Sequence, residues 1–223
     1  MPEIAQSAAA VPHSRIRELA EIALNMDGVL KLYFGESNLP TPHFIKQAAQ
    51  RALDEGWTYY TSNAGMPSTR AALAAYYRRL HGVEVDPKRN VVVTASGVQA
   101  LNVAIRCVLD PGDEAIVLTP AWPNGSAIVE MANARVIQVP HVLDGRRFTV
   151  DFDALKRAVS RRTKLLLYTS PSNPHGWTAT DEEQTALLEF ARKHGLWLMA
   201  DEVYERLYYR EEAATAPTVL KKT

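Results

Sequence analysis

The sequence predicts an α/β fold in which a mostly parallel sheet lies between two layers of helices. Three observations lead to this prediction. Runs rich in Val, Leu and Ile recur at the length of strands, a segment with helical periodicity follows each run, and Gly, Pro or Asp residues separate the two. Strands that are apolar throughout are typical of parallel sheets that are covered on both faces.

The first third of the chain is expected to be mostly helical. Residues 1–13 are rich in Ala and contain two prolines, and we expect them to form a flexible N-terminal arm. Apolar residues that recur on one face predict a helix over residues 15–26, and a short apolar run predicts a strand over 30–34. Further helices are expected over 43–56 and, with proline in the first turn, over 67–82.

From residue 90 the pattern alternates regularly between strand and helix. Strands are expected over residues 90–95, 114–119, 135–140 and 163–170, and from residue 196 onward. Helices are expected between them, over residues 98–109, 124–133, 152–159 and 181–195. We see no internal repeat in this pattern. In such sheets ligands bind at the carboxyl ends of the strands, so the informative residues should follow directly after each strand.

Composition excludes several classes of partner. The 223 residues carry 25 basic and 25 acidic side chains, so there is no basic excess for nucleic acid or an anionic membrane. No run is long enough for a membrane span and no signal peptide is apparent, so we expect a cytoplasmic protein. The six histidines show no metal-ligand spacing. Cys107, the single cysteine, lies in an apolar run, where we expect it to be buried.

Chemistry-bearing residues follow four of the expected strands. Gly97 opens a helix after residues 90–95, where backbone amides and the helix dipole favour a phosphate, although an ordinary N-cap at Ser96 explains the same pattern. Trp122 follows residues 114–119 and is placed to stack on a planar ring, or simply to pack. Asn173 lies in a Pro- and Gly-restrained loop after residues 163–170. Asp201 closes the last apolar strand, where a carboxylate is costly unless it is paired.

These residues form an ordered series of short motifs. The series comprises Ser96-Gly97-x-Gln99, Pro120-x-Trp122, Ser172-Asn173-Pro174-x-Gly176 and Asp201-Glu202-x-Tyr204. Residues 32–42 and 57–67 add two further segments, which contain Gly35-Glu36 and Gly65-x-Pro67. In this order the motifs resemble the class I and II aminotransferases, which depend on pyridoxal 5′-phosphate (PLP) and have the aspartate aminotransferase fold, PLP fold type I. The resemblance covers residues 14–220.

The resemblance implies a role for four residues around the cofactor ring. Asp201 would pair with the pyridine nitrogen of PLP, so that the protonated ring can accept the electrons released from the substrate. Asn173 and Tyr204 would hydrogen-bond the 3′-oxygen, and Trp122 would stack on the ring face.

Further residues are implied for the phosphate, the substrate and the partner subunit. Gly97 and Val98, with Gln99 nearby, would hold the cofactor phosphate at the start of a helix. Tyr60 would reach the phosphate bound by the other subunit of a homodimer. Gly35 would contact the substrate carboxylate through its main chain. The implied substrates are an amino acid and a 2-oxo acid.

The resemblance also divides the chain into parts. After the arm of residues 1–13, residues 14–56 would belong to the small-domain and active-site region. Residues 57–223 would form a partial, incomplete PLP-binding large domain, and the C-terminal small domain would be absent.

The lysine that forms the Schiff base in this family has no counterpart among these residues. It lies in a Ser-x-Ser-Lys context further along the family's sequence, whereas Lys221 and Lys222 lack that context. We therefore expect no catalytic residue in this chain, which would be a fragment that is inactive alone. The alternatives are a fragment of a sister PLP lyase and a non-catalytic protein that keeps the PLP fold for binding or dimerisation. The retained set of Asn173, Asp201 and Tyr204 favours a former enzyme.

Overall fold

The computed structural model describes residues 2–35, 37–210 and 213–223, which form two compact units. One unit is Pro12–Asn63, and the other combines the residues up to Val11 with Ala64–Thr223. Each unit is described by itself. The domain boundaries expected after residues 13 and 56 stay predictions about the parent enzyme.

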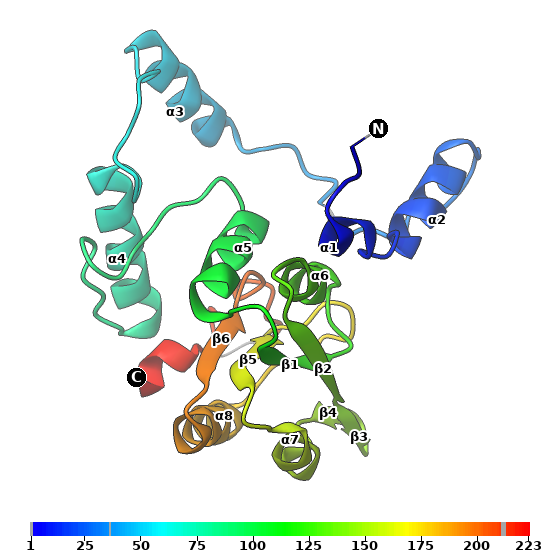
Figure 1. Cartoon of the computed structure of the whole chain (residues 1–223). Helices are drawn as coiled ribbons and strands as arrows, with labels where there is room; N and C mark the ends of the chain where they lie inside the picture. Colours follow the sequence, from blue (N-terminus) through cyan, green and yellow to red (C-terminus); the bar gives the residue numbers. More distant parts are fainter. Residues whose placement is uncertain (1, 36, 211–212) are drawn as a thin grey trace. The chain divides into compact units, whose positions relative to one another are not determined.

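A four-stranded parallel sheet is the centre of the larger unit (Figure 1). Its strands are β1 (Glu114–Thr119), β2 (Arg135–Pro140), β5 (Thr163–Thr169) and β6 (Trp197–Asp201), in the order β2-β1-β5-β6. All three pairings are parallel. The predicted α/β class with a parallel sheet is therefore confirmed.

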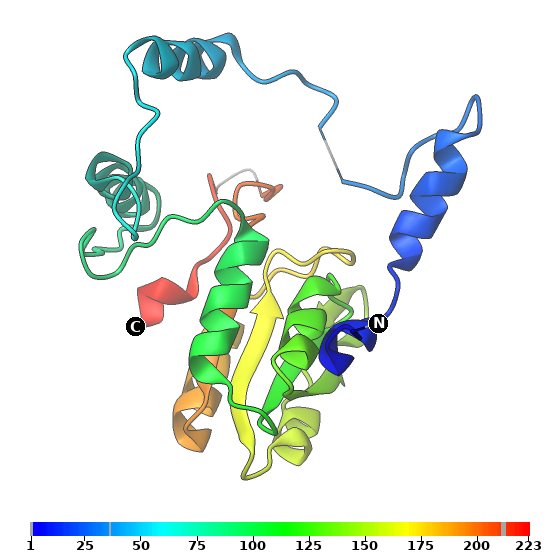
Figure 2. The ribbon, with the colours of Figure 1, turned by 45° about the horizontal axis from the view of Figure 1, so that its top comes forward.

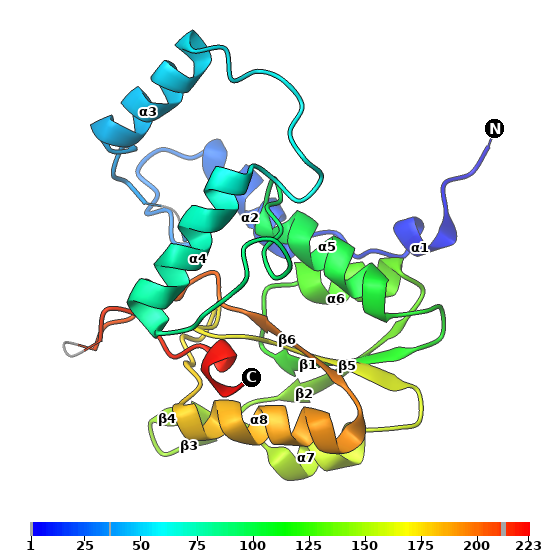
Figure 3. The ribbon, with the colours of Figure 1, turned by 90° about the vertical axis from the view of Figure 1, so that its left-hand side faces the viewer.

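Helices cover both faces of this sheet, as Figure 3 shows. α5 (Gly97–Val108) and α6 (Asn124–Met131) lie on one face, and α7 (Phe152–Ala158) and α8 (Asp181–His194) lie on the other. Alternate residues of β1 separate accordingly into two cores: Ala115 and Val117 pack in the α5/α6 core, and Ile116 and Leu118 pack in the opposite one. Because both faces of the sheet are buried, every residue of such a strand packs in one core or the other, and the strand sequence is apolar throughout.

The strand order of the sheet changes direction between β1 and β5, because the strand after β1 is added on one side and the strand after β5 is added on the other. From β1 the chain passes through α6 to β2, whereas from β5 it passes through α8, on the other face, to β6. The loops that follow β1 and β5 therefore diverge, which opens a binding edge at their carboxyl ends. Figure 2 shows that α5 begins at this same end of the sheet.

The remaining elements of the larger unit are α1 (Gln6–Ala9), α4 (Pro67–His81), the hairpin β3 (Val142–Asp144) and β4 (Arg147–Thr149), and the 3-10 turn η1 (Val219–Lys222). The smaller unit contains α2 (Arg15–Leu24) and α3 (His43–Asp54). Within the described residues no helix is both long and apolar enough to cross a membrane.

Two of the expected strands do not form. Residues 30–34 are irregular, and so are residues 90–95, although the latter run is rich in valine. A strand requires a partner for its backbone ladder. Val93 donates one hydrogen bond to Ala64 O (2.9 Å), and the side chain of Val92 is exposed. The strands predicted from apolar composition at residues 30–34 and 90–95 were therefore wrong.

One smaller expectation also needs correction. Cys107 is exposed, because it lies on the face of α5 that is turned away from the sheet, near the exposed Val103. The expected N-terminal arm contains the short helix α1, which its Ala-rich composition favours, and its flexibility stays a prediction.

Candidate active site

Asp201 ends β6 at the carboxyl edge of the sheet. Strand alternation places it on the same face as Met199, which packs against the α5/α6 core. Asp201 and Trp122 line one small cavity of about 20 Å³, together with Tyr168 and Thr169. The structure therefore brings together the acid and the aromatic ring that the sequence singled out.

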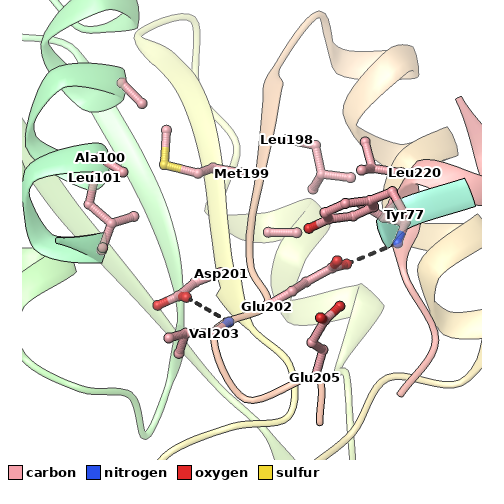
Figure 4. A pocket seen from close by; sticks show the side chains of 14 residues that line it. Tyr77, Ala100, Leu101, Leu198, Met199, Asp201, Glu202, Val203, Glu205 and Leu220 are labelled. Carbon is pink, nitrogen blue, oxygen red and sulfur yellow. Dashed lines mark hydrogen bonds between the residues drawn. The ribbon is translucent and has the colours of Figure 1, made fainter. Parts of the chain in front are cut away.

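The Asp201 carboxylate is more than half buried and has weak polar support. Its Oδ1 accepts a hydrogen bond from Val203 N (3.3 Å) (Figure 4), and the side chain of Thr169 donates another. Burial raises the pKa of Asp201, and the two hydrogen bonds oppose that rise. Within residues 2–35, 37–210 and 213–223, no Lys, Arg or His forms an ion pair with it. Such a site favours a ligand that brings its own positive charge.

Asn173 and Tyr204 meet across the loops that follow β5 and β6. Asn173 Nδ2 donates a hydrogen bond to the Tyr204 hydroxyl (3.3 Å). The Asn173 loop is fixed from within, because Ser170 Oγ accepts from Ala179 N (3.0 Å) and Ser172 N donates to Trp177 O (2.8 Å). The amide and the phenol therefore form a fixed pair that can bind one oxygen of a ligand.

The N-terminus of α5 faces an open space. Ser96 Oγ accepts from Gln99 N (3.2 Å), and Gln99 Oε1 accepts from Ala95 N (2.7 Å), so these side chains cap the helix from both directions. The first-turn amides of Gly97 and Val98 have no acceptor inside the helix. A Cβ atom at Gly97 would meet nothing within 4 Å. The N-cap at Ser96 and an anion site at Gly97 are thus compatible.

A larger cavity of about 590 Å³ borders Asp201 and the start of α5, and Glu202 and Glu205 also line it (Figure 4). It is lined by Gly97, Leu101 and Asp201, and the last two also line the cavity beside Trp122. A helix start, a carboxylate without a cation and an aromatic ring thus border adjoining spaces. Together they fit a planar, cationic heteroaromatic ring that carries a phosphate group, which is the chemistry of PLP.

Gly35 and Tyr60 belong to the other compact unit, Pro12–Asn63. The Tyr60 side chain is fully exposed, and a Cβ atom at Gly35 would meet nothing within 4 Å. Their roles toward the substrate and the partner subunit stay predictions. Glu36, which follows Gly35 in the family motif, lies outside the described residues.

Sequence reasoning did not identify the residues that support this site. Glu202 and Glu205 alternate with Asp201 and Tyr204, and Glu205 contacts His81. Strand alternation puts Glu202 on the face opposite Asp201, and this is the one signal that the sequence offers for it. No local pattern indicated Glu205 or His81, because the two residues lie 124 positions apart.

Comparisons with known proteins give the family of this chain. A family model described as "Aminotransferase class I and II" matches residues 28–222. The chain belongs to the class I and II aminotransferase family. This aminotransferase-family chain is 34% identical over 216 residues to an aspartate aminotransferase of Pyrococcus horikoshii, covering 97% of the chain and 54% of that relative. It is 40% identical over 193 residues to an aspartate/prephenate aminotransferase of Thermus thermophilus, covering 86% and 50%.

Solved structures of aminotransferases share the fold. The structure of N-succinyldiaminopimelate aminotransferase from Mycobacterium tuberculosis matches with a TM-score of 0.89 and 33% identity, covering 96% of this chain and 55% of that one. The chain thus spans about half the length of the relatives that it matches.

Proposed function

We propose that this chain carries the cofactor-binding part of a PLP-dependent aminotransferase that moves an amino group between an amino acid and a 2-oxo acid. The observation that carries the proposal is the set of residues around Asp201. A half-buried carboxylate without a cation among the described residues lies beside Trp122 and opens toward the first turn of α5. The family membership supports the same reaction class.

Asp201 would hold a proton on the pyridine nitrogen of the cofactor. A cation next to a carboxylate favours the ionised carboxylate, so the bound pyridinium would offset the cost of burying Asp201. Bound PLP supplies the electron sink for breaking the bond between the substrate Cα and its hydrogen. The side chain of Asp201 would keep that sink effective, because a protonated ring accepts electrons more readily.

Asn173 and Tyr204 would bind the 3′-oxygen from two directions, since their side chains already meet at 3.3 Å. Trp122 would cover one face of the ring and exclude water from it. The amides of Gly97 and Val98 would bind the phosphate, with the helix dipole adding favourable charge. Gln99 would act mainly by shaping that loop, because its side-chain oxygen already accepts from Ala95 N.

The smaller unit would supply the remaining contacts. We propose that the main chain at Gly35 contacts the substrate carboxylate, and that Tyr60 completes the phosphate site of a second subunit. A homodimer with its sites at the interface follows from that role of Tyr60. A cytoplasmic location also stays a proposal.

Phosphate dependence of ligand binding tests this function. Pyridoxamine 5′-phosphate is the suitable probe, because it has the ring, the 3′-oxygen and the phosphate but no aldehyde that reacts with surface lysines. Titration calorimetry should give one site per chain, with binding at least tenfold weaker for pyridoxamine, which lacks the phosphate. Equal binding of the two compounds, or no saturable binding, would contradict the proposal.

The Schiff-base lysine is proposed to lie in the half of the enzyme that this chain does not span. Lys222 Nζ pairs with Asp181 Oδ1 (2.9 Å), and neither it nor Lys221 lies in the family's Ser-x-Ser-Lys context. Borohydride reduction with PLP, followed by peptide mass mapping, should show no preferred adduct at these two lysines. A specific adduct at either one would mean that this chain has its own Schiff-base lysine.

A further inference from the structure

The turn that carries Asp201 and Tyr204 is attached to the rest of the unit through two glutamates. Figure 4 shows the carboxylate of Asp201 directed toward Leu101, whereas the carboxylate of Glu202 is directed toward Tyr77. Both glutamates line the same larger cavity as Asp201, but their carboxylates are bonded to η1, the residue before it, and α4.

Glu202 binds the segment before η1 with both of its oxygens. Its Oε2 accepts a hydrogen bond from Thr218 Oγ1 (2.7 Å), and its Oε1 accepts one from Val219 N (3.0 Å). Thr218 is completely buried and Val219 is 7% exposed. The contact therefore holds the start of the turn against a well-packed part of the chain.

Glu205 binds α4 in the same manner. Tyr76 donates its hydroxyl hydrogen to Glu205 Oε1, and His81 Nε2 lies 2.8 Å from Glu205 Oε2. The side chain of His81 is 0% exposed and that of Glu205 is 14% exposed. The backbone oxygen of Glu205 also accepts from Ala216 N (2.8 Å).

Further hydrogen bonds also support the turn. Within it, Glu205 N donates to Glu202 O (3.0 Å), and Val203 and Leu207 are exposed. Asn173 Nδ2 donates to the Tyr204 hydroxyl (3.3 Å) and Leu207 N donates to Tyr204 O (2.8 Å), while the two glutamates are the residues of the turn that bind α4 and η1.

We propose that Glu202 and Glu205 are positioning residues, which hold Asp201 and Tyr204 in the orientation that the cofactor requires. The inference rests on the proposed function, and it concerns two residues that line the larger cavity while their carboxylates are bonded to other parts of the chain. Glu202 fixes the main chain next to Asp201, and Glu205 fixes the main chain next to Tyr204.

The phenol of Tyr77, which lies near the two glutamates, is neutral at neutral pH. Burial raises the pKa of Glu202, while its hydrogen bonds from Thr218 and Val219 oppose that rise. Burial and the two neighbouring carboxylates raise the pKa of Tyr77 to about 12, so this phenol adds no further negative charge at neutral pH. Among the described residues, His81 is the basic side chain that pairs with Glu205.

Two readouts on the whole chain test the proposal. The test variants are Glu202→Ala and Glu205→Ala. The more conservative Glu202→Gln and Glu205→Gln keep an acceptor oxygen. Glu189→Ala, on the exposed side of α8, is the matched control. Hydrogen exchange of the ligand-free chain should rise at least tenfold in residues 201–207 of the Ala variants, with β1 and β5 unchanged. The affinity for pyridoxamine 5′-phosphate should fall about tenfold, and the Gln variants should recover part of both losses.

The outcomes separate this inference from the proposed function. If the Ala variants match the parent chain in either exchange or affinity, the positioning role is wrong. If exchange rises in β1 and β5 as well, the glutamates act on overall stability and the positioning role is again wrong. If the parent chain binds no pyridoxamine 5′-phosphate, the proposed function fails, and the exchange of residues 201–207 alone decides whether the glutamates hold the turn.

Discussion

Asn173 and Tyr204 come from loops that follow neighbouring strands, and the amide nitrogen of Asn173 donates to the hydroxyl of Tyr204 at 3.3 Å. The pairing depends on the parallel alignment of β5 and β6, because Thr169 and Asp201 are register partners at the ends of those strands. Parallel strands thus bring together two residues that are 31 positions apart.

Removing either member of this pair should weaken cofactor binding. Each hydrogen bond contributes about 1 kcal/mol, so Tyr204→Phe and Asn173→Ala should each lower the affinity for pyridoxamine 5′-phosphate about five- to tenfold. Titration calorimetry measures the change. Tyr209→Phe, at an exposed tyrosine, is the control and should bind as the parent chain does. Unchanged binding by both pair variants would remove these residues from the cofactor site.

Gly65 is required for the packing of the segment that precedes α4. Its φ is +96°, and an added Cβ atom would lie 2.6 Å from Val93 Cβ. Gly65→Ala should therefore lower the free energy of unfolding by about 2–3 kcal/mol, combining backbone strain and overpacking. Gly112→Ala is the matched control, because Gly112 has φ +91° with open space around it, and its cost should be near 1 kcal/mol. If urea unfolding gives the same loss of unfolding free energy for both variants, Val93 does not obstruct a Cβ atom at position 65.

His141 and His175 make the stability of the larger unit sensitive to acid. Their ring centroids lie 4.8 Å apart, and burial lowers the pKa of His141 to about 4 and lowers that of His175 as well. The folded chain thus binds fewer protons than the unfolded chain between pH 6.5 and about 4. Stability should therefore fall as the pH decreases through this window.

Urea unfolding against pH measures this effect. After a reduction for solvent screening of the half-buried ring, His141 should account for about 1–2 kcal/mol of the loss. His141→Phe should flatten the profile between pH 6.5 and 4, whereas His43→Gln, at an exposed histidine, should not. A profile of unchanged slope in His141→Phe would assign the acid sensitivity to other groups.

The sequence was most informative where a pattern is local. The strand at Glu114–Thr119 was predicted with its bounds, because the apolar or β-favouring run of residues 115–119 lies between turn residues. The hairpin of β3 and β4 was not predicted, since each strand has three residues and too few positions to show a period.

Predictions that depend on a distant partner were less secure. Residues 90–95 have strand composition but no ladder partner in the described part of the chain, so they stay irregular. Asp201, Asn173 and Trp122 could be named from motifs because each lies at or within four residues of the carboxyl end of a strand. Glu205 and His81 could not, because a contact across 124 positions leaves no local trace in one sequence.

Affinity of the Asp201 variant for pyridoxamine 5′-phosphate is the most direct test of the account. Asp201→Asn keeps the shape of the side chain but removes the charge that would face the pyridinium, and Asp144→Asn, in the exposed hairpin, is the matched control. We predict that the parent chain and the control bind one equivalent with equal affinity, and that Asp201→Asn binds at least tenfold more weakly, a loss of about 1.4 kcal/mol or more. Equal affinity in all three proteins would contradict the assignment of Asp201 and, with it, the proposed cofactor site.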